Sequence, residues 1–172
     1  MKKIQAQLSR QTVSSNSEEA YTLYKKSNFG ERVGEKIQYT LSEALYLVET
    51  GKMEIYVKQK LILKKDLIKK LQRIDKRLDI KYPVFKDLRK KGYIVKTALK
   101  FGGDFRVYEK SSKLKKQHSK WIVFVDYESK RITWHEFSAK NRVAHSTNKK
   151  LLLAIIDEEG DITYYEVRWL KP

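Results

Sequence analysis

The sequence predicts an α+β N-terminal domain followed by an α/β C-terminal domain built on a mixed sheet. A chain of 172 residues with 41% hydrophobic content can hold one medium or two small packed cores. Signals for short, local helices and strands fill the first 80 residues, whereas the part after residue 93 is rich in strands with one helix among them. We therefore place a boundary near residue 80, between domains that cover residues 1–80 and 81–172.

The N-terminal elements follow from helix caps and from the spacing of apolar residues. Thr40 and Glu43 fit a capping box, in which the threonine hydroxyl accepts from a free backbone N–H and the glutamate reaches back, and Gly51 offers a left-handed stop. An amphipathic helix with lysine outside is predicted by apolar residues that repeat at four and three: Leu63, Leu67, Leu71, Ile74 and Leu78. The expected order is a strand over 1–10, a polar turn at 14–17, helices over 18–26 and 41–50, a strand over 53–57 and the helix over 63–78.

Proline and glycine mark the limits of several C-terminal elements. Pro83 can open a helix, because its missing N–H is not needed in the first turn, and Gly92 can end it. The acidic run from Asp157 to Asp161 is typical of a hairpin turn. The expected elements are a helix over 83–91, strands over 93–99, 104–109, 121–126 and 131–134, a helix over 137–147, and strands over 151–156 and 162–169.

The charge of the chain indicates a polyanionic partner. Thirty-eight Lys and Arg against 21 Asp and Glu give a formal net charge of +17. Residues 57–91 alone hold fourteen basic and four acidic residues. Lysine-dense surfaces neutralise phosphates and release counterions, so nucleic acid is the first expectation. The alternatives are a solvated helix face and a heat-adapted protein with many lysines in ion-pair networks.

Several classes of protein are excluded or disfavoured by what the sequence lacks. There is no cysteine, and therefore no disulfide framework, thiolate nucleophile or cysteine-ligated zinc. Neither a membrane span nor a signal peptide is supported, so a cytoplasmic protein is expected. There is no P-loop, GxGxxG, HExxH or nucleophile elbow. Ser146 and Lys149 match an S-x-x-K pattern, but the other two elements of the serine acyltransferases are missing.

An acidic pair near a lysine offers one route to nuclease chemistry. Asp126 and Glu128, followed by Lys130, could hold the metal of a magnesium-dependent nuclease. The same residues lie between two expected strands and also fit a polar hairpin turn, which we favour.

The three histidines, His118, His135 and His145, limit the candidates for general acid or base. His118 differs in context, since it ends a lysine-rich stretch, residues 113–117, just before an expected strand. A phosphate bound there would favour the protonated, donating imidazole. His118 is therefore favoured over His135 and His145 as a general acid or base.

Three stretches of the sequence resemble the tRNA-intron endonuclease family. They are residues 82–93 (YPVFKDLRKKGY), 100–108 (KFGGDFRVY) and 142–149 (RVAHSTNK), with LAIID at 153–157 following the last. The resemblance spans about residues 82–169 and is looser over 1–75. It implies a restriction-endonuclease-like catalytic domain and an enzyme that cuts precursor tRNA at bulge-helix-bulge splice sites.

Carried over by position, the family's catalytic tyrosine, histidine and lysine fall on Tyr108, His118 and Lys149. The resemblance implies metal-independent attack of a ribose 2′-hydroxyl without a cofactor, which leaves a 2′,3′-cyclic phosphate and a 5′-hydroxyl. Tyr108 would be the base, His118 the acid and Lys149 the cation that stabilises the five-coordinate phosphorus. A free tyrosine has a pKa of about 10, so ionising it at pH 7 costs on the order of 4 kcal/mol unless cations help.

The resemblance also implies contacts with RNA and with other subunits. Arg142 corresponds to an arginine that stacks on a bulged base, and its partner falls on Arg168 or Trp169. The interface residues would be in the acidic turn that inserts into a basic cleft of an opposing subunit: Asp157, Glu158, Glu159 and Asp161. The expected assembly is a homo-oligomer or a hetero-tetramer with a non-catalytic paralogous subunit. A non-catalytic RNA-binding subunit and a magnesium-dependent nuclease are the alternatives.

Overall fold

A computed structural model describes residues 2–110 and 118–170 of the chain. The chain divides into two compact units, Met1–Asp79 and Ile80–Pro172, which are described separately below. Across the described residues, the helices are all too short or too polar to traverse a lipid bilayer.

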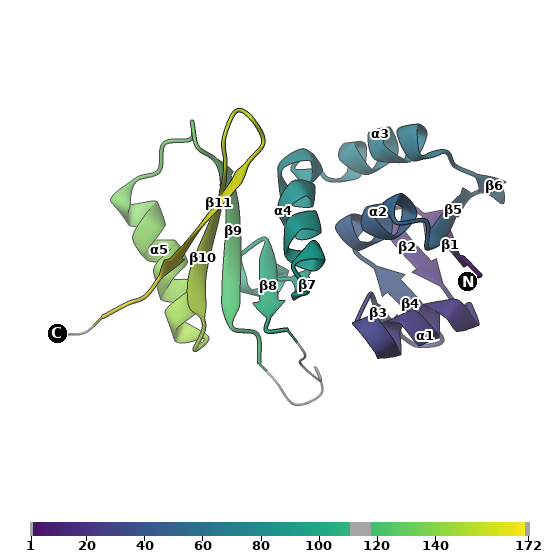
Figure 1. Cartoon of the computed structure of the whole chain (residues 1–172), viewed down its shortest axis with the longest axis horizontal. Helices are drawn as coiled ribbons and strands as arrows, with labels where there is room; N and C mark the ends of the chain where they lie inside the picture. The colour runs from purple at the N-terminus through teal and green to yellow at the C-terminus, as the bar shows by residue number, and fades with distance from the viewer. Residues whose placement is uncertain (1, 111–117, 171–172) are drawn as a thin grey trace. The chain divides into compact units, whose positions relative to one another are not determined.

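The first unit is a six-stranded sheet with three helices (Figure 1). Its elements are β1 (Ile4–Ser9), β2 (Thr12–Ser15), α1 (Glu18–Ser27), β3 (Glu31–Val33), β4 (Lys36–Tyr39), α2 (Leu41–Glu49), β5 (Met53–Val57), β6 (Lys60–Leu61) and α3 (Lys64–Ile74). The strand order is β3-β4-β2-β1-β5-β6, and only β1 and β5 pair in parallel. The sheet is therefore mixed, and α3 packs on α2.

Local caps explain why two of these helices are where the sequence predicted them. The Ser17 side chain accepts from Ala20 N at the start of α1. Thr40 and Glu43 form the predicted capping box of α2, and Gly51 after it has a φ of +70°. Glu43 is buried, and its carboxylate also accepts from Gly30 N at 3.0 Å, which ties α2 to the preceding loop.

Other expectations for the first unit were wrong. Ser15 belongs to β2 instead of a turn, since its hydroxyl donates to Gln5 O of β1 at 2.6 Å. Strands β2, β3, β4 and β6 were not predicted. β3 and β6 are exposed and too short to show an apolar alternation, whereas β4 has one, with Ile37 and Tyr39 buried, that was overlooked. The helix expected over residues 63–78 ends at Ile74, where Asp75 leaves the helical conformation.

The second unit is a five-stranded mixed sheet. Its elements are α4 (Leu78–Lys90), β7 (Ile94–Thr97), η1 (Leu99–Phe101), β8 (Phe105–Tyr108), β9 (Trp121–Tyr127), α5 (Trp134–Ser146), β10 (Lys150–Ile156) and β11 (Ile162–Val167). The order is β11-β10-β9-β8-β7, with β9 and β10 parallel and joined through α5. The other neighbours are antiparallel.

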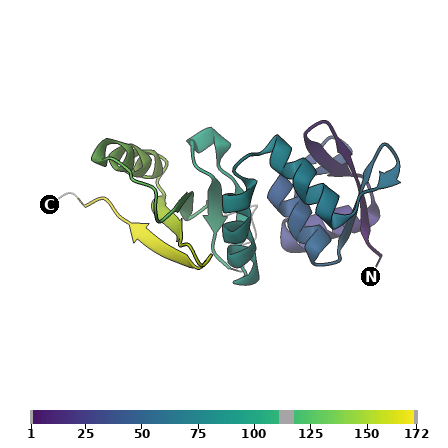
Figure 2. The same cartoon turned by 90° about the horizontal axis from the view of Figure 1, so that it is seen from above.

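Helices α4 and α5 cover opposite faces of this sheet. Phe85 of α4 lies with its ring centroid 5.9 Å from that of Phe105. On the other face, a buried cluster joins α5 to the sheet: Ala98, Ile122, Ala144 and Leu151. Figure 2 shows α5, in green, above the yellow strand β11. Because side chains alternate along a strand, each sheet residue can be assigned to the α4 face or to the α5 face.

The structure also corrects three boundaries in the second unit. Helix α4 begins at Leu78, so Pro83 lies inside it and does not open it. The strand expected over 131–134 is absent from this described stretch, because Thr133 and Glu136 form a second capping box and α5 starts at Trp134. Strand β11 ends at Val167, two residues earlier than expected.

Candidate active site

The backbone of Lys120 joins three strand ends at one place in the second unit. Its N–H donates to Val107 O of β8 at 2.8 Å, and its carbonyl accepts from Lys150 N of β10 at 2.9 Å. Tyr108 follows Val107, Lys149 precedes Lys150, and His118 lies two residues before Lys120. Tyr108, His118 and Lys149 are therefore close in the chain to one backbone junction, although Tyr108 and Lys149 are 41 positions apart in the sequence.

Tyr108 ends strand β8 and is 8% exposed. It is two positions from Arg106, so both side chains belong to the same face of the sheet. Arg106 pairs with Ile122, which packs against α5, so this is the α5 face. The α5 face of β8 therefore carries both the Tyr108 phenol and the Arg106 guanidinium.

Lys149 is held in the turn between α5 and β10. Its backbone N–H donates to Ala144 O at 2.9 Å, and its ammonium donates to Thr147 O at 2.7 Å. The ammonium also lies 5.2 Å from the ring centroid of Phe101. Burial lowers the pKa of Lys149, and the positive charge of Arg106 lowers this pKa further. Lys149 is thus a cation with a fixed position beside a second cation.

His118 is exposed at the start of the segment that leads into β9. Next to it Ser119 is buried, with 5% exposure, so the chain is anchored directly after the histidine. The lysine-rich stretch at residues 113–117, from which we argued for His118, lies outside the described residues. The position of His118 near the Lys120 junction is the structural observation that remains.

The predicted RNA-binding residues do not all come together. Arg142 is exposed on α5, and His145, one turn further along, packs against Trp169 with ring centroids 4.1 Å apart at 75°. Residues three apart on a helix are neighbours, so Arg142 and Trp169 lie on the same side of α5. Arg168 is instead paired with Glu166, Nε to Oε1 at 2.7 Å.

Glu166 was not singled out in the sequence analysis, although the structure makes it a centre of hydrogen bonds. Its carboxylate accepts from the Trp121 indole at 2.8 Å, from Lys150 at 3.1 Å and from Arg168 at 2.7 Å. The Trp121 hydrogen bond is the main cause that lowers the pKa of Glu166 to about 2, with the two cations contributing. Glu166 therefore remains ionised over the whole physiological range and holds β9, β10 and the chain after β11 together. Its only sequence signal is an acid in a strand whose neighbour, β10, begins with a basic residue, Lys150.

The acidic turn between β10 and β11 has the hairpin geometry expected from its residues. Asp157 N donates to Asp161 O at 3.1 Å, and Asp161 N donates to the Asp157 carboxylate at 2.8 Å. Gly160 has a φ of +89°, a left-handed conformation that favours glycine. Glu158, Glu159 and Asp161 are exposed.

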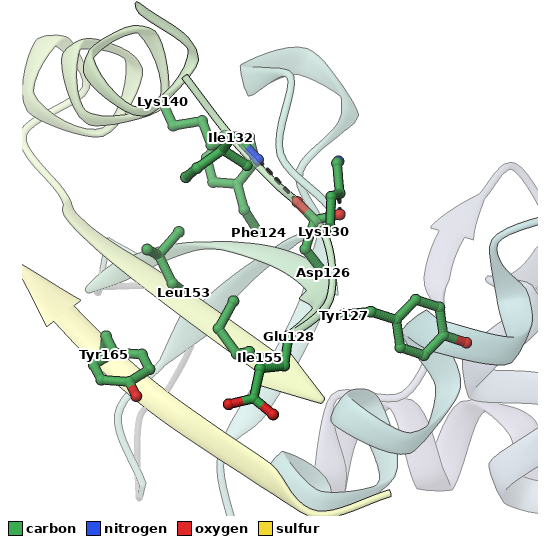
Figure 3. Close-up of a pocket in the computed structure, with 10 residues that line it drawn as sticks. All are labelled: Phe124, Asp126, Tyr127, Glu128, Lys130, Ile132, Lys140, Leu153, Ile155 and Tyr165. Atoms are coloured by element: carbon green, nitrogen blue, oxygen red, sulfur yellow. Dashed lines mark hydrogen bonds and ion pairs between the residues drawn. The ribbon is translucent and has the colours of Figure 1, made fainter. Parts of the chain in front are cut away.

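A separate hollow lies on the α5 face, away from the strand ends just described (Figure 3). Its floor is apolar, with Leu153 and Ile155 of β10 beside Tyr165 of β11. Asp126, the candidate metal ligand, is paired there with Lys130 at 2.8 Å and with Lys140 at 3.2 Å. No group of three or more acids and histidines that could hold a metal ion occurs within residues 2–110 and 118–170.

Two family models match the chain. The model of the tRNA intron endonuclease catalytic C-terminal domain matches residues 78–164, which include Tyr108, His118 and Lys149. The model of the N-terminal domain of the same family matches residues 4–68. The chain belongs to the tRNA intron endonuclease family. The unit with the Lys120 junction carries the catalytic domain of this family.

Archaeal proteins are similar to this chain over most of their length. A tRNA-splicing endonuclease of Pyrococcus horikoshii is 43% identical over 99% of this chain and 98% of its own. The proteins of the same name from Nanoarchaeum equitans and Methanothermobacter thermautotrophicus are 42% and 41% identical. These matches cover 84% and 89% of this chain and 97% and 89% of the relatives.

Proposed function

We propose that this protein is a tRNA-splicing endonuclease that cuts precursor tRNA at bulge-helix-bulge splice sites without a metal ion. The observation that carries the proposal is the Lys120 junction, in a domain of the tRNA intron endonuclease family, where the candidate base, acid and cation attach. The net charge of +17 supports an RNA substrate.

The proposed reaction is an internal transfer of the phosphodiester. Tyr108 takes the proton of the 2′-hydroxyl, whose oxygen forms a bond to phosphorus while the bond from phosphorus to the 5′-oxygen breaks. His118 gives a proton to the departing 5′-oxygen, so the products are a 2′,3′-cyclic phosphate and a 5′-hydroxyl. Charge that accumulates on the phosphoryl oxygens is stabilised by Lys149, a cation already held in place by Thr147.

For RNA binding we propose that Arg142 and Trp169 receive the bulged base. Arg142 is exposed, and Trp169 lies against the same side of α5 through His145. Both a guanidinium plane and an indole can stack on a base. The Arg168 guanidinium is the weaker candidate, since it is already paired with the strongly acidic Glu166.

We further propose a multi-subunit enzyme in which the acidic turn contacts another subunit. A substrate with two cleavage sites requires two active sites at a set spacing. Strand β11 is at the edge of the sheet and has only β10 as a neighbour among the described strands, so its other side can pair with a second chain. A homo-oligomer and a hetero-tetramer with a non-catalytic paralogue both fit this arrangement.

We propose that the two domains, at residues 1–80 and 81–172, have different roles. We propose that the second is restriction-endonuclease-like and supplies the chemistry. Its central parallel pair, connected by a helix and flanked by antiparallel strands, supports this classification.

One experiment separates this proposal from a magnesium-dependent nuclease. Purified protein is mixed with a bulged precursor tRNA in EDTA, alone and with a candidate partner subunit, and the product ends are analysed. We expect cleavage to cyclic phosphate ends, and none on RNA whose attacking 2′-hydroxyls are replaced by hydrogen. Loss of cutting in EDTA, or cutting of the deoxy-substituted RNA, would contradict the mechanism. No cutting with any partner would leave a non-catalytic RNA-binding subunit.

The role of His118 is tested by His118→Ala. We expect the single-turnover rate to fall by about 10² to 10⁴, with little change in the Kd for uncleavable RNA, because general acid catalysis contributes about that much. His135→Ala, which changes another exposed histidine of the same unit, is the control and should keep the rate. A large loss of affinity at an unchanged rate would mean that His118 binds RNA and does not react.

A further inference from the structure

Helix α3 of the first unit carries a line of basic side chains. The helix has five basic residues and one acid, compared with four and two on α4. Its buried residues are Leu67 and Leu71. Three exposed residues lie on the side of the helix away from these leucines: Lys65, Lys69 and Arg73. They are within about 80° of one another around the helix axis. We call them the α3 stripe.

The α3 stripe is costly to the isolated fold. Lys65 and Lys69, and Lys69 and Arg73, are like-charged neighbours at four-residue spacing, which destabilises a helix by about 0.2–0.5 kcal/mol per pair. At the end of α4 the same spacing is used for an ion pair, Lys91 with Asp87 at 2.7 Å. The three members of the stripe have no ion-pair partner among the residues that the structure describes. A face tuned only for solubility or heat stability would contain acids at these positions.

We propose that the α3 stripe is a second RNA-contacting surface, which binds the phosphate backbone of the precursor tRNA outside the cleaved bonds. The three cations follow a straight line with about 6 Å between neighbours, and a nucleic-acid strand is a linear polyanion with a charge every few ångströms. This inference rests on the proposed function, because the ligand of the stripe is the precursor tRNA of that proposal. It assigns RNA affinity to the first unit of this chain.

An acidic segment of a second copy is the competing partner. The acidic turn is the obvious candidate, but it is compact, and the Asp157 carboxylate is occupied by Asp161 N within the turn. A short closed turn matches a line of cations along a helix less well than an extended backbone does. RNA is therefore the partner to which the proposal commits.

The test is the triple variant Lys65→Gln/Lys69→Gln/Arg73→Gln in the full chain. Its Kd for precursor tRNA with hydrogen in place of the attacking 2′-hydroxyls is measured by filter binding from 50 to 300 mM KCl. We expect Kd at 150 mM KCl to rise at least about tenfold, and the slope of log Kd against log salt to fall by about two to three. At saturating cleavable RNA, kcat should stay within about twofold of wild type.

A matched control removes equal charge elsewhere on the same unit. Lys25→Gln/Lys26→Gln/Lys36→Gln changes three exposed lysines, and we expect its Kd to stay within about threefold of wild type. The variant Lys65→Arg/Lys69→Arg keeps the charge and should bind as wild type. Thermal melting checks the fold, and the stripe variant should melt no lower than wild type, since repulsion has been removed.

Three results would overturn the inference. Wild-type Kd and salt slope in the stripe variant would show that α3 does not contact RNA. An equal loss of affinity in the control variant would show that the stripe variant binds less RNA only because its net charge is lower. A lower oligomer mass in sedimentation would show that the stripe binds another subunit. If the wild-type protein cleaves no RNA, the proposed function fails first; if it cleaves and the stripe variant binds normally, only this inference fails.

Discussion

Two groups of cations in this molecule are built in different ways. Those at the strand ends of the second unit each have a partner: Lys120 with Glu109, Lys149 with Thr147 O, and Lys150 with Glu166. The cations of the α3 stripe are exposed and stand next to like charges. The first group is held by hydrogen bonds or ion pairs, whereas the second has no ion-pair partner among the described residues.

The difference fits the two tasks that an RNA-cleaving enzyme needs from lysine. Stabilising a transition state requires a cation that is already in place, and the burial that fixes Lys149 also lowers its pKa. Binding a nucleic-acid backbone without regard to sequence requires only positive charge near the phosphates. An exposed lysine in water can meet this requirement without a fixed position. The net charge of +17 does not distinguish these two kinds of cation.

The largest effect is expected where a fixed cation is removed. Lys149→Met should lower the single-turnover rate by about 10² to 10³, as for the loss of one preorganised donor in other enzymes. The Kd for uncleavable precursor tRNA should change by less than about threefold. The control is Lys150→Met, which removes the neighbouring lysine that is paired with Glu166. Equal losses of rate in both variants would show that Lys149 has no special role.

A smaller effect is expected where Glu166, the partner of Lys150, is changed. Glu166→Gln should reduce the free energy of unfolding by roughly 1 kcal/mol, since its ion pairs are partly exposed. The folded-state pKa of Glu166 is lowered to about 2 from an ordinary 4.5, so its stabilisation is present above about pH 4.5 and is lost as the pH falls toward 2. The difference in Tm between wild type and Glu166→Gln should therefore shrink between pH 6 and pH 3. A constant difference would mean that the carboxylate charge does not matter.

The smallest effect is expected in the α3 stripe, with the opposite sign. Lys69→Gln removes two like-charge pairs and one opposite-charge pair, with Asp66, so it should raise the free energy of unfolding by about 0.2–0.5 kcal/mol at low salt. Urea denaturation at 10 mM and 500 mM KCl measures this gain, which should largely disappear at high salt through screening. Lys25→Gln, which removes a cation from the last turn of α1, should give no gain. Destabilisation by Lys69→Gln would indicate an ion pair that holds the stripe.

The sequence by itself determined the elements whose signals are local. Helix α2 follows from Thr40 and Glu43, because the capping hydrogen bonds involve residues three apart, and β5 lies at residues 53–57 as expected. The second capping box, at Thr133 and Glu136, was equally local and was overlooked, which misplaced the start of α5. The family resemblance, through motifs in a fixed order, indicated the enzyme and its candidate residues.

Only the tertiary structure decided where these residues meet and how they are held. Pro83 lies within α4, although its local preference is to begin a helix, since helix α4 packs its Phe85 against the sheet. The Lys120 junction, the hydrogen bond from Lys149 to Thr147 O and the three partners of Glu166 depend on strand order and register. Strand pairing joins residues far apart in the chain, so no local pattern specifies it. That is why the sequence named Tyr108 and Lys149 but could not show that Arg106 lies beside Lys149, or distinguish a lysine held by a hydrogen bond from an exposed one.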